Sequence, residues 1–254
     1  MLDRILAEHR EKAADDPRLT DALVDLAKRA PEPRNFDAAL RRPGLSVIAE
    51  VKRRSPSKGE ISPDLDPASL AQAYASGGAA CVSVLTDETF FGGSMEDLVE
   101  ARAASGLPAL RKDFTVSAND ICDARVAGAD AVLLIVAALT PAQLTEFHQL
   151  AEDLAMACLV EAHSEREVEL ALASGARIVG VNQRDLKDFS VDPERAARLA
   201  ELIPDDVLKV AESGISGRED ASRAFEAGYD AILVGELLVR SADPAAVVKA
   251  LRCS

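Results

Sequence analysis

Ionisable side chains stand at the ends of four short apolar runs in this chain. Lys52 and Lys112 end the runs 46–52 and 107–112, and Glu161 and Glu212 end the runs 157–161 and 207–212. A charge at the end of a buried strand costs desolvation free energy unless it has a partner or a task. Because the arrangement recurs, we expect these groups to meet in one site, where neighbouring charges set different proton affinities for an acid and a base. A structural ion-pair network is the alternative, since buried pairs also shift pKa values.

The elements that must position these groups repeat along the chain. Four segments share a glycine that ends a helix and an apolar strand that follows it, and these glycines recur roughly every 50 residues with one more strand candidate between each pair. The strands are predicted at 46–52, 80–85, 108–112, 131–136, 157–161, 177–182, 207–212 and 231–235. Helices with Ser, Thr or Asp start signals are predicted at 67–76, 95–104, 118–127, 141–155, 165–174, 193–201, 217–227 and 244–251.

Strict alternation of eight strands and helices predicts an α/β fold, a (β/α)8 TIM barrel, with an open doubly wound sheet as the alternative. Residues 1–254 are expected to form one domain, of which 1–45 is a helical extension packed on the barrel. Two amphipathic helices are predicted there, one with an apolar stripe at Leu2, Ile5 and Leu6, and one that opens at Asp16-Pro17 and carries Leu19, Leu23 and Leu26. An extended connector with Pro31, Pro33 and Pro43 follows.

Composition excludes several classes of protein. A net charge of −14 leaves no broad basic surface for a nucleic-acid backbone, so no nucleic-acid partner is expected. No run is long enough to span a membrane, and the charged N-terminus does not resemble a signal peptide. The four cysteines lack metal or disulfide spacing, which favours buried thiols in a cytoplasmic protein. His9, His148 and His163 are isolated in sequence and two are expected on helix surfaces, so no metal site is predicted.

A barrel of this kind builds its site on the rim formed by the carboxyl ends of its strands. The residues projected onto that rim are Glu50, Lys52, Lys112, Glu161, Asn182 and Glu212. Glycine loops at 212–217 and 234–236 follow the last two strands, where such barrels hold phosphate through backbone N–H groups. The cationic loop 53–59 suggests a small anionic ligand. Ordinary turn chemistry, with Ser216 as a helix cap, and a solvated basic loop are the alternatives.

An ordered set of motifs resembles one family over nearly the whole chain. Residues 47–59 (VIAEVKRRSPSKG) resemble the signature of indole-3-glycerol phosphate synthases, barrels of the tryptophan pathway. Further segments look like that family in the same order: 85–94 (LTDETFFGGS), 110–114 (LRKDF), 131–135 (AVLLI), 159–161 (LVE), 180–186 (GVNQRDL) and 210–215 (VAESGI). The resemblance implies conversion of 1-(2-carboxyphenylamino)-1-deoxyribulose 5-phosphate to indole-3-glycerol phosphate, with loss of carbon dioxide and water and without a cofactor.

The same resemblance implies roles for individual residues. Lys112 would be the general acid that protonates the ketone oxygen, and Glu161 the base that assists dehydration. Lys52 would stabilise charge and Glu50 and Glu212 would position the lysines and sugar hydroxyls. Asn182 would bond the ring system or a hydroxyl, and Arg184 would pair with the substrate carboxylate. The binding residues implied are Ser55, Ser213, Gly214, Gly235 and the backbone of Glu236 for phosphate, and Phe91, Phe114, Leu133 and Leu186 for the anthranilate ring.

One position departs from the family pattern, and two rival functions remain. Many relatives carry Ser where this chain has Glu236, whose carboxylate would repel phosphate if it pointed inward.

Phosphoribosylanthranilate isomerase, a similar barrel, would place a Cys near the end of the first strand, where this chain has Glu50 and Lys52. A non-catalytic sugar-phosphate-binding subunit would not need Lys112 and Glu161. We expect a monomer that binds a small phosphorylated substrate; association with other tryptophan-pathway enzymes stays open.

Overall fold

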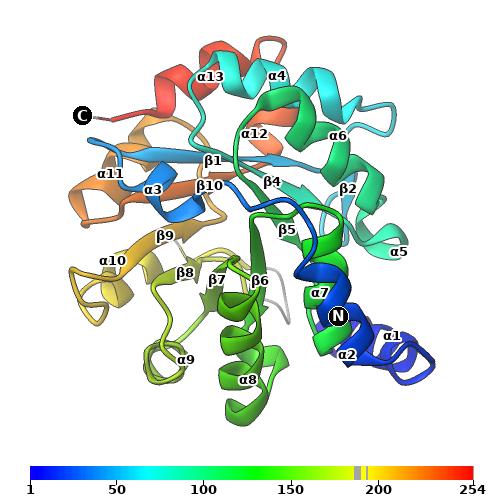
Figure 1. Cartoon of the computed structure of the whole chain (residues 1–254). Coiled ribbons are helices and arrows are strands. Elements are labelled where there is room, and N and C mark those ends of the chain that lie inside the picture. Colours follow the sequence, from blue (N-terminus) through cyan, green and yellow to red (C-terminus); the bar gives the residue numbers. More distant parts are fainter. Residues whose placement is uncertain (186–189, 193, 254) are drawn as a thin grey trace.

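Eight parallel strands close into a barrel in the computed structural model, which describes residues 1–185, 190–192 and 194–253 (Figure 1). Around the barrel the order is β1-β10-β9-β8-β7-β6-β5-β4, so the first and last strands pair and no edge is left. The strands are β1 (Ser46–Val51), β4 (Cys81–Leu85), β5 (Ala109–Lys112), β6 (Ala131–Ile135), β7 (Ala157–Ala162), β8 (Ile178–Asn182), β9 (Leu208–Glu212) and β10 (Ala231–Val234). The predicted barrel is confirmed, and the open sheet is excluded.

Helices on the outside of the barrel follow the predicted pattern closely. They are α4 (Pro67–Ser76), α6 (Met95–Ser105), α7 (Ala118–Val126), α8 (Pro141–Asp153), α9 (Glu165–Ala173), α10 (Arg195–Ala200), α11 (Arg218–Glu226) and α13 (Pro244–Leu251). Ser94, Ser117 and Thr140 form capping boxes, which explains why these starts were predictable. The prediction that Ser216 caps a helix was wrong. Gly217 is the N-cap of α11, and the backbone N–H and hydroxyl of Ser216 instead donate to Asp220.

Short elements in the loops were not predicted. They are the hairpin β2 (Arg54–Ser55) and β3 (Gly59–Glu60), the helices α3 (Phe36–Leu40), α5 (Glu88–Phe91) and α12 (Glu236–Val239), and the 3-10 turn η1 (Val136–Ala138). Side chains cap two of them, because Asn35 accepts from the backbone of α3 and Asp87 from that of α5. Segments of four or five residues are too short to show a periodic apolar pattern. The predicted extended connector therefore contains a helix.

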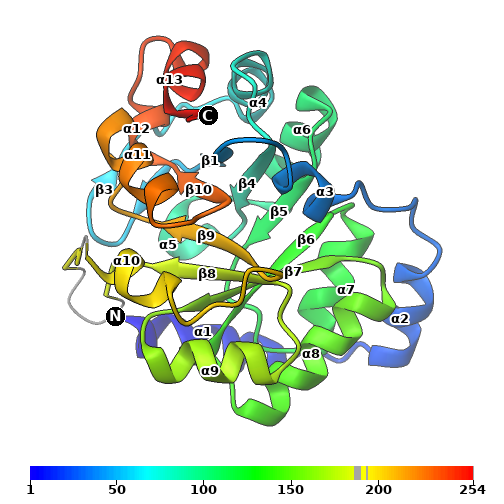
Figure 2. The same ribbon diagram turned by 90° about the vertical axis from the view of Figure 1, so that its left-hand side faces the viewer.

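The N-terminal extension runs from one end of the barrel to the other. Its helix α1 (Leu2–Ala14) reaches the carboxyl end of the strands, where His9 meets Asp87, while α2 (Thr20–Ala27) lies against α7 (Figures 1 and 2). The stripe predicted for α2 was partly wrong, because Leu19 and Leu26 are 76% and 49% exposed. The helix begins at Thr20 rather than after Asp16-Pro17, so Leu23 and Ala27 form its buried face.

Alternate residues of each strand face two different cores. Outward residues such as Val132 and Leu134 of β6 pack under the helices, while Leu133 points into the barrel. Inside the barrel, Ile48, Leu110, Leu159 and Val210 fill the layers below the rim. Two residues further along each of these strands, the next inward position lies at the mouth and carries a charged side chain: Glu50, Lys112, Glu161 and Glu212. All four cysteines are buried and free, and in the part of the chain described here no helix is long and apolar enough to cross a membrane.

Asp130 fastens the far end of the barrel to the extension. Its buried carboxylate accepts from the backbone N–H of Arg34 at 2.6 Å, from the guanidinium of Arg102 at 2.8 Å and from the N–H of Ala109 at 2.8 Å.

Asp130→Ala should lower the free energy of unfolding by about 3 kcal/mol, because it leaves a partly buried guanidinium without its partner. Urea denaturation checks this, with exposed Asp153→Ala, expected within about 0.5 kcal/mol of wild type, as the control. Equal losses in both variants would contradict the prediction.

Candidate active site

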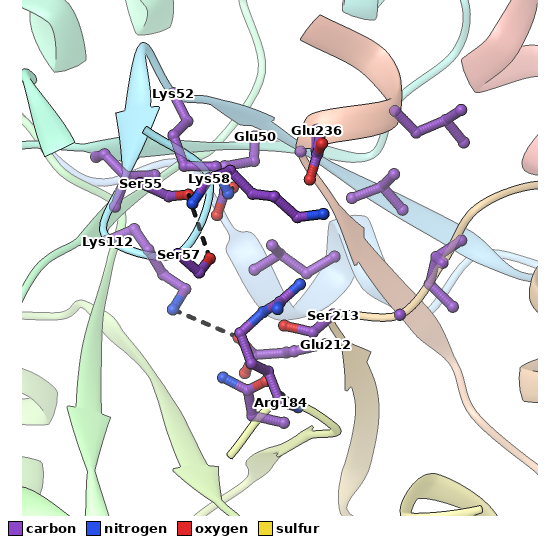
Figure 3. A pocket seen from close by; sticks show the side chains of 18 of the residues that line it. Glu50, Lys52, Ser55, Ser57, Lys58, Lys112, Arg184, Glu212, Ser213 and Glu236 are labelled. Atoms are coloured by element: carbon purple, nitrogen blue, oxygen red, sulfur yellow. Dashed lines mark hydrogen bonds and ion pairs between the residues drawn. The ribbon is translucent and has the colours of Figure 1, made fainter. Parts of the chain in front are cut away.

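Charged groups from several strands converge at the carboxyl end of the barrel, over a cavity of about 980 Å³. Nζ of Lys112 is 3.0 Å from Oε2 of Glu161 and 3.5 Å from Oε2 of Glu212. Figure 3 shows Lys112 directed toward Glu212. Both carboxylates are nearly inaccessible, with 1% and 2% of their residue surfaces exposed. An ammonium thus faces two buried carboxylates, an arrangement that ties all three proton affinities together.

The protonation states follow from burial and charge. Burial raises the pKa of Glu212 to about 8, and the Glu161 carboxylate beside it acts in the same direction. For Glu161 burial also favours the neutral form, but the ammonium of Lys112 overcomes it and lowers the pKa. Lys112 loses hydration by burial, yet Glu161 and Glu212 together raise its pKa. Near neutral pH the cluster therefore holds a charged lysine, an ionised Glu161 and a protonated Glu212.

Two glycines leave the space that these carboxylates need. A Cβ on Gly180, the inward residue of β8 beside Glu161, would collide with Oε1 of Glu212. A Cβ on Gly235 would collide with Oε1 of Glu50 and lie 3.1 Å from Nζ of Lys52. Gly235 was predicted as a backbone contact for phosphate, whereas Gly180 was not singled out. The sequence did contain a signal for Gly180, because a glycine at an inward strand position beside Glu161 and Glu212 indicates that a side chain or ligand approaches the backbone closely.

Lys52, Glu50 and Asn182 complete the polar rim as predicted. Lys52 pairs with the carboxylate of Glu50, two residues earlier on the same face of β1. The backbone carbonyl of that Glu50 accepts from the buried hydroxyl of Tyr74, which fixes the end of the strand. The side chain of Asn182 contributes to the lowered pKa of Glu161, and its Oδ1 accepts from the backbone N–H of Arg184 at 3.0 Å. The rim is thus cross-linked before any ligand is present.

Backbone donors gather on the side of the cavity after β9 and β10. Ser213 and Gly214 both adopt positive φ values, 63° and 73°, in a turn that lines the cavity. A non-glycine residue in this region is strained, and such strain tends to occur at ligand sites. Ser55, Gly235 and Glu236 line the same side, and Oε1 of Glu236 accepts from the guanidinium of Arg240 at 3.1 Å. That pairing partly neutralises the carboxylate at the predicted phosphate side of the cavity.

An apolar wall lies opposite these donors. The rings of Phe91 and Phe114 have centroids 6.3 Å apart, and Leu133 comes from β6 beside them. Arg184 also lines the cavity, and Figure 3 shows it near Glu212. Leu186, the remaining residue predicted for this wall, lies outside the described residues. The other predicted site residues lie around one cavity.

Some residues around the cavity were missed by sequence reasoning. Ser57, Lys58 and Arg240 line it, and the cationic loop was the only signal for the first two. The histidines are isolated in sequence, as stated above, but two of them have surroundings that the sequence did not reveal. His163 lies between Glu161 and Glu167, and His148 is buried rather than on a helix surface.

His9 also has partners that the sequence did not reveal. A ring nitrogen of His9 and one carboxylate oxygen each from Asp87 and Asp113 lie within 4.8 Å of one another, a spacing that a metal ion could bridge. Both carboxylates, however, already accept protein hydrogen bonds. Asp87 accepts from the backbone of α5, and Asp113 accepts from Thr86 and Arg111. The three groups therefore make a link between α1 and the rim.

The fold and the acid–base cluster define an enzyme of the (β/α)8-barrel class. A family model described as indole-3-glycerol phosphate synthase matches residues 2–251. A Streptomyces coelicolor protein named indole-3-glycerol phosphate synthase 2 is 54% identical over 229 residues, 90% of this chain and 89% of that protein. A Nocardioides protein named indole-3-glycerol phosphate synthase is 52% identical over 245 residues, 96% of this chain and 92% of that protein. The chain belongs to the indole-3-glycerol phosphate synthase family, which confirms the resemblance.

Solved structures of more distant barrels agree with the architecture. Thiamine phosphate pyrophosphorylase from Pyrococcus furiosus superposes with a TM-score of 0.61 at 17% identity, covering 82% of this chain and 93% of that one. Orotidine 5′-phosphate decarboxylase from Pyrococcus horikoshii gives 0.60 at 14% identity, covering 81% and 96%. At these identities the likeness concerns the fold alone.

The raised pKa of Glu212 has a consequence for stability. Between the ordinary carboxyl pKa of 4.5 and about 8 the folded protein keeps a proton that the unfolded chain has lost, so this group makes unfolding easier as pH rises through that window. Glu212→Gln imitates the protonated form and removes the effect. Urea titrations from pH 5 to 8 should show the free energy of unfolding falling more steeply in wild type, by up to about 1.4 kcal/mol per pH unit. Parallel pH profiles would show that Glu212 is ionised in the folded protein.

Proposed function

We propose that this chain closes the indole ring, converting 1-(2-carboxyphenylamino)-1-deoxyribulose 5-phosphate to indole-3-glycerol phosphate with loss of carbon dioxide and water. Family membership over nearly the whole chain supports a decarboxylating lyase of tryptophan biosynthesis. The observation that carries the mechanism is the contact of Lys112 with two buried carboxylates at the mouth of the barrel. Ring closure needs a proton donor at the ketone oxygen and a proton acceptor during dehydration, and this cluster contains both.

Lys112 is the proposed general acid. Its ammonium would protonate the ketone oxygen while the ring carbon attacks, so the developing alkoxide meets a positive charge in a water-poor cavity. The ionised Glu161 that faces it keeps it charged before the reaction. Glu212 and Glu50 would position Lys112, Lys52 and the sugar hydroxyls, and Lys52 would stabilise negative charge.

Glu161 is the proposed base of the dehydration step. It is ionised near neutral pH because Lys112 lowers its pKa, so it can accept a proton from the intermediate once the hydroxyl leaves. Asn182 helps to lower the pKa of this carboxylate and is expected also to contact the ring system or a hydroxyl of the substrate. Protonation of Glu161 would weaken its pairing with Lys112, which links the two proton transfers.

The two sides of the cavity suit the two ends of the substrate. Phosphate would lie against Ser55, the N–H groups of the turn at Ser213 and Gly214, and those of Gly235 and Glu236, with Lys52 nearby. The anthranilate ring would pack on the phenylalanine wall, and Arg184 would pair with its carboxylate through a planar fork. Polar donors on one side and rings on the other set the substrate's orientation.

The rival functions explain the site less well. An isomerase of the phosphoribosylanthranilate type would carry a Cys near the end of β1, where Glu50 and Lys52 stand. A binding subunit would have no use for a lysine buried between two carboxylates, whose assembly costs desolvation free energy. We further propose that the protein acts in the cytoplasm as a monomer, with association with other tryptophan-pathway enzymes as the open alternative.

Removal of the proposed acid should stop turnover without unfolding the barrel. Lys112→Ala is expected to lower kcat by at least 100-fold, the lower range of general acid catalysis. Fluorescence of the indole product after mixing with the carboxyphenylamino substrate measures this, and equilibrium binding of the substrate to the variant shows that the pocket persists. Exposed Lys249→Ala, on α13, is the control and should turn over normally. Full activity of Lys112→Ala with retained binding would disprove the acid assignment.

The carboxylate of Glu236 is expected to weaken phosphate binding. Glu236→Gln removes the negative charge but keeps the backbone N–H that would bind phosphate, so KM should fall, by roughly threefold for a partly screened charge, while kcat stays near wild type. Inhibition by inorganic phosphate should strengthen by a similar factor. Exposed Glu96→Gln, far from the cavity on α6, serves as the matched control. Unchanged phosphate inhibition in Glu236→Gln would place the phosphate elsewhere.

A further inference from the structure

His163 touches the face of Glu161 that Lys112 leaves open. Lys112 binds Oε2 of Glu161, whereas Nε2 of His163 lies 3.4 Å from Oε1. His163 follows Glu161 by two residues, which puts both side chains on the same side of the extended backbone at the end of β7. The ring nitrogen is shielded from solvent and has no hydrogen bond of good geometry. A buried polar atom left in this state, beside a carboxylate that must accept a proton, calls for an explanation.

The opposite side of the imidazole ring is held by a second carboxylate. Oε2 of Glu167, in the first turn of α9, accepts from the backbone N–H of His163 at 2.8 Å and lies 3.2 Å from ring Nδ1. Ser164 caps the same helix turn, so the position of Glu167 is fixed by the start of α9. When Nδ1 donates to Glu167, the neutral ring presents the lone pair of Nε2 to Glu161. The ring can then receive a proton from a protonated Glu161.

Charge around the ring favours this transfer. Glu161 from β7 and Glu167 from α9 face it from both sides. The segments η1 and β8, which pack against α9, contain no charged residue in their sequences VAA and IVGVN. The Glu167 side chain is 23% exposed and reaches water, whereas the Glu161 side chain is only 1% exposed.

We propose that His163 is a positioning and relay residue: it accepts on Nε2 the proton that Glu161 takes from the substrate, and releases its Nδ1 proton through Glu167 to water. This rests on the proposed role of Glu161 as the base. No bond other than those to the moving protons changes, and Glu161 returns to its ionised form. The transfers leave the ring as its Nε2–H tautomer, and proton exchange with water restores Nδ1–H before the next turnover. Without the relay, the proton would have to leave a buried carboxylate through the substrate cavity itself.

Two amide replacements test the relay because each keeps one of the ring's contacts. His163→Asn places an amide nitrogen near the position of Nδ1 and keeps a partner for Glu167, while His163→Gln places one near Nε2 and keeps a partner for Glu161. Neither amide can pass on a proton, so both variants should lose kcat, by roughly tenfold or more, with KM within about twofold of wild type. His148→Asn, a buried histidine on α8 outside the cavity, is the matched control and should keep kcat.

Chemical rescue separates a relay from a purely structural role. In His163→Ala, added imidazole should restore kcat in a concentration-dependent way, and it should not act on Glu161→Gln. Unchanged kcat in folded His163→Asn and His163→Gln, or a loss in His163→Ala that imidazole does not restore, would overturn the relay. Glu161→Gln distinguishes the two levels of the argument. If that variant turns over normally the base assignment itself fails, whereas an inactive Glu161→Gln beside a fully active His163→Asn refutes the relay alone.

Discussion

The contact of one ammonium with two buried carboxylates governs the rest of the site. Lys112 can stay charged in a cavity mouth because the ionised Glu161 faces it, and Glu212 can lie beside that carboxylate because it keeps a proton. Gly180 gives the second carboxylate its space. Such a cluster costs desolvation free energy that a core of apolar side chains would not, and proton transfer in ring closure gives a reason for it.

The barrel supplies this contact by simple geometry. Inward positions on a strand alternate, so Leu110, Leu159 and Val210 fill the interior one layer below Lys112, Glu161 and Glu212. The apolar layer removes water beneath the charges, and the contact of His9 with Asp87 ties α1 to the rim. The distal end is fastened independently by Asp130. Stability and chemistry thus reside at opposite ends of the same strands.

Sequence reasoning recovered the eight strands to within about two residues and the residues of the rim, because period-two apolar runs and capping side chains are local signals. It failed where the determinant is tertiary. The exposed Leu19 and Leu26 depend on where α2 begins, and the short helices α3, α5 and α12 depend on caps and packing. The role of Gly180 depends on Glu161 and Glu212 of the two adjacent strands, and an inward glycine was its one local signal. The role of His163 depends on Glu167 beyond the start of α9, which no linear pattern shows. The family resemblance separated the roles of Lys52 and Lys112, which their positions alone left undecided.

The central claim is that the cluster holds a charged lysine, an ionised glutamate and a protonated glutamate at neutral pH. Carbon-13 NMR of the protein labelled at the glutamate carboxyl carbons measures this directly in the absence of ligand. We expect one carboxyl signal to stay in its protonated position at pH 6.5, to titrate near pH 8, as the raised pKa of Glu212 requires, and to be missing in Glu212→Gln. A spectrum in which every glutamate is ionised by pH 6.5 would contradict the account.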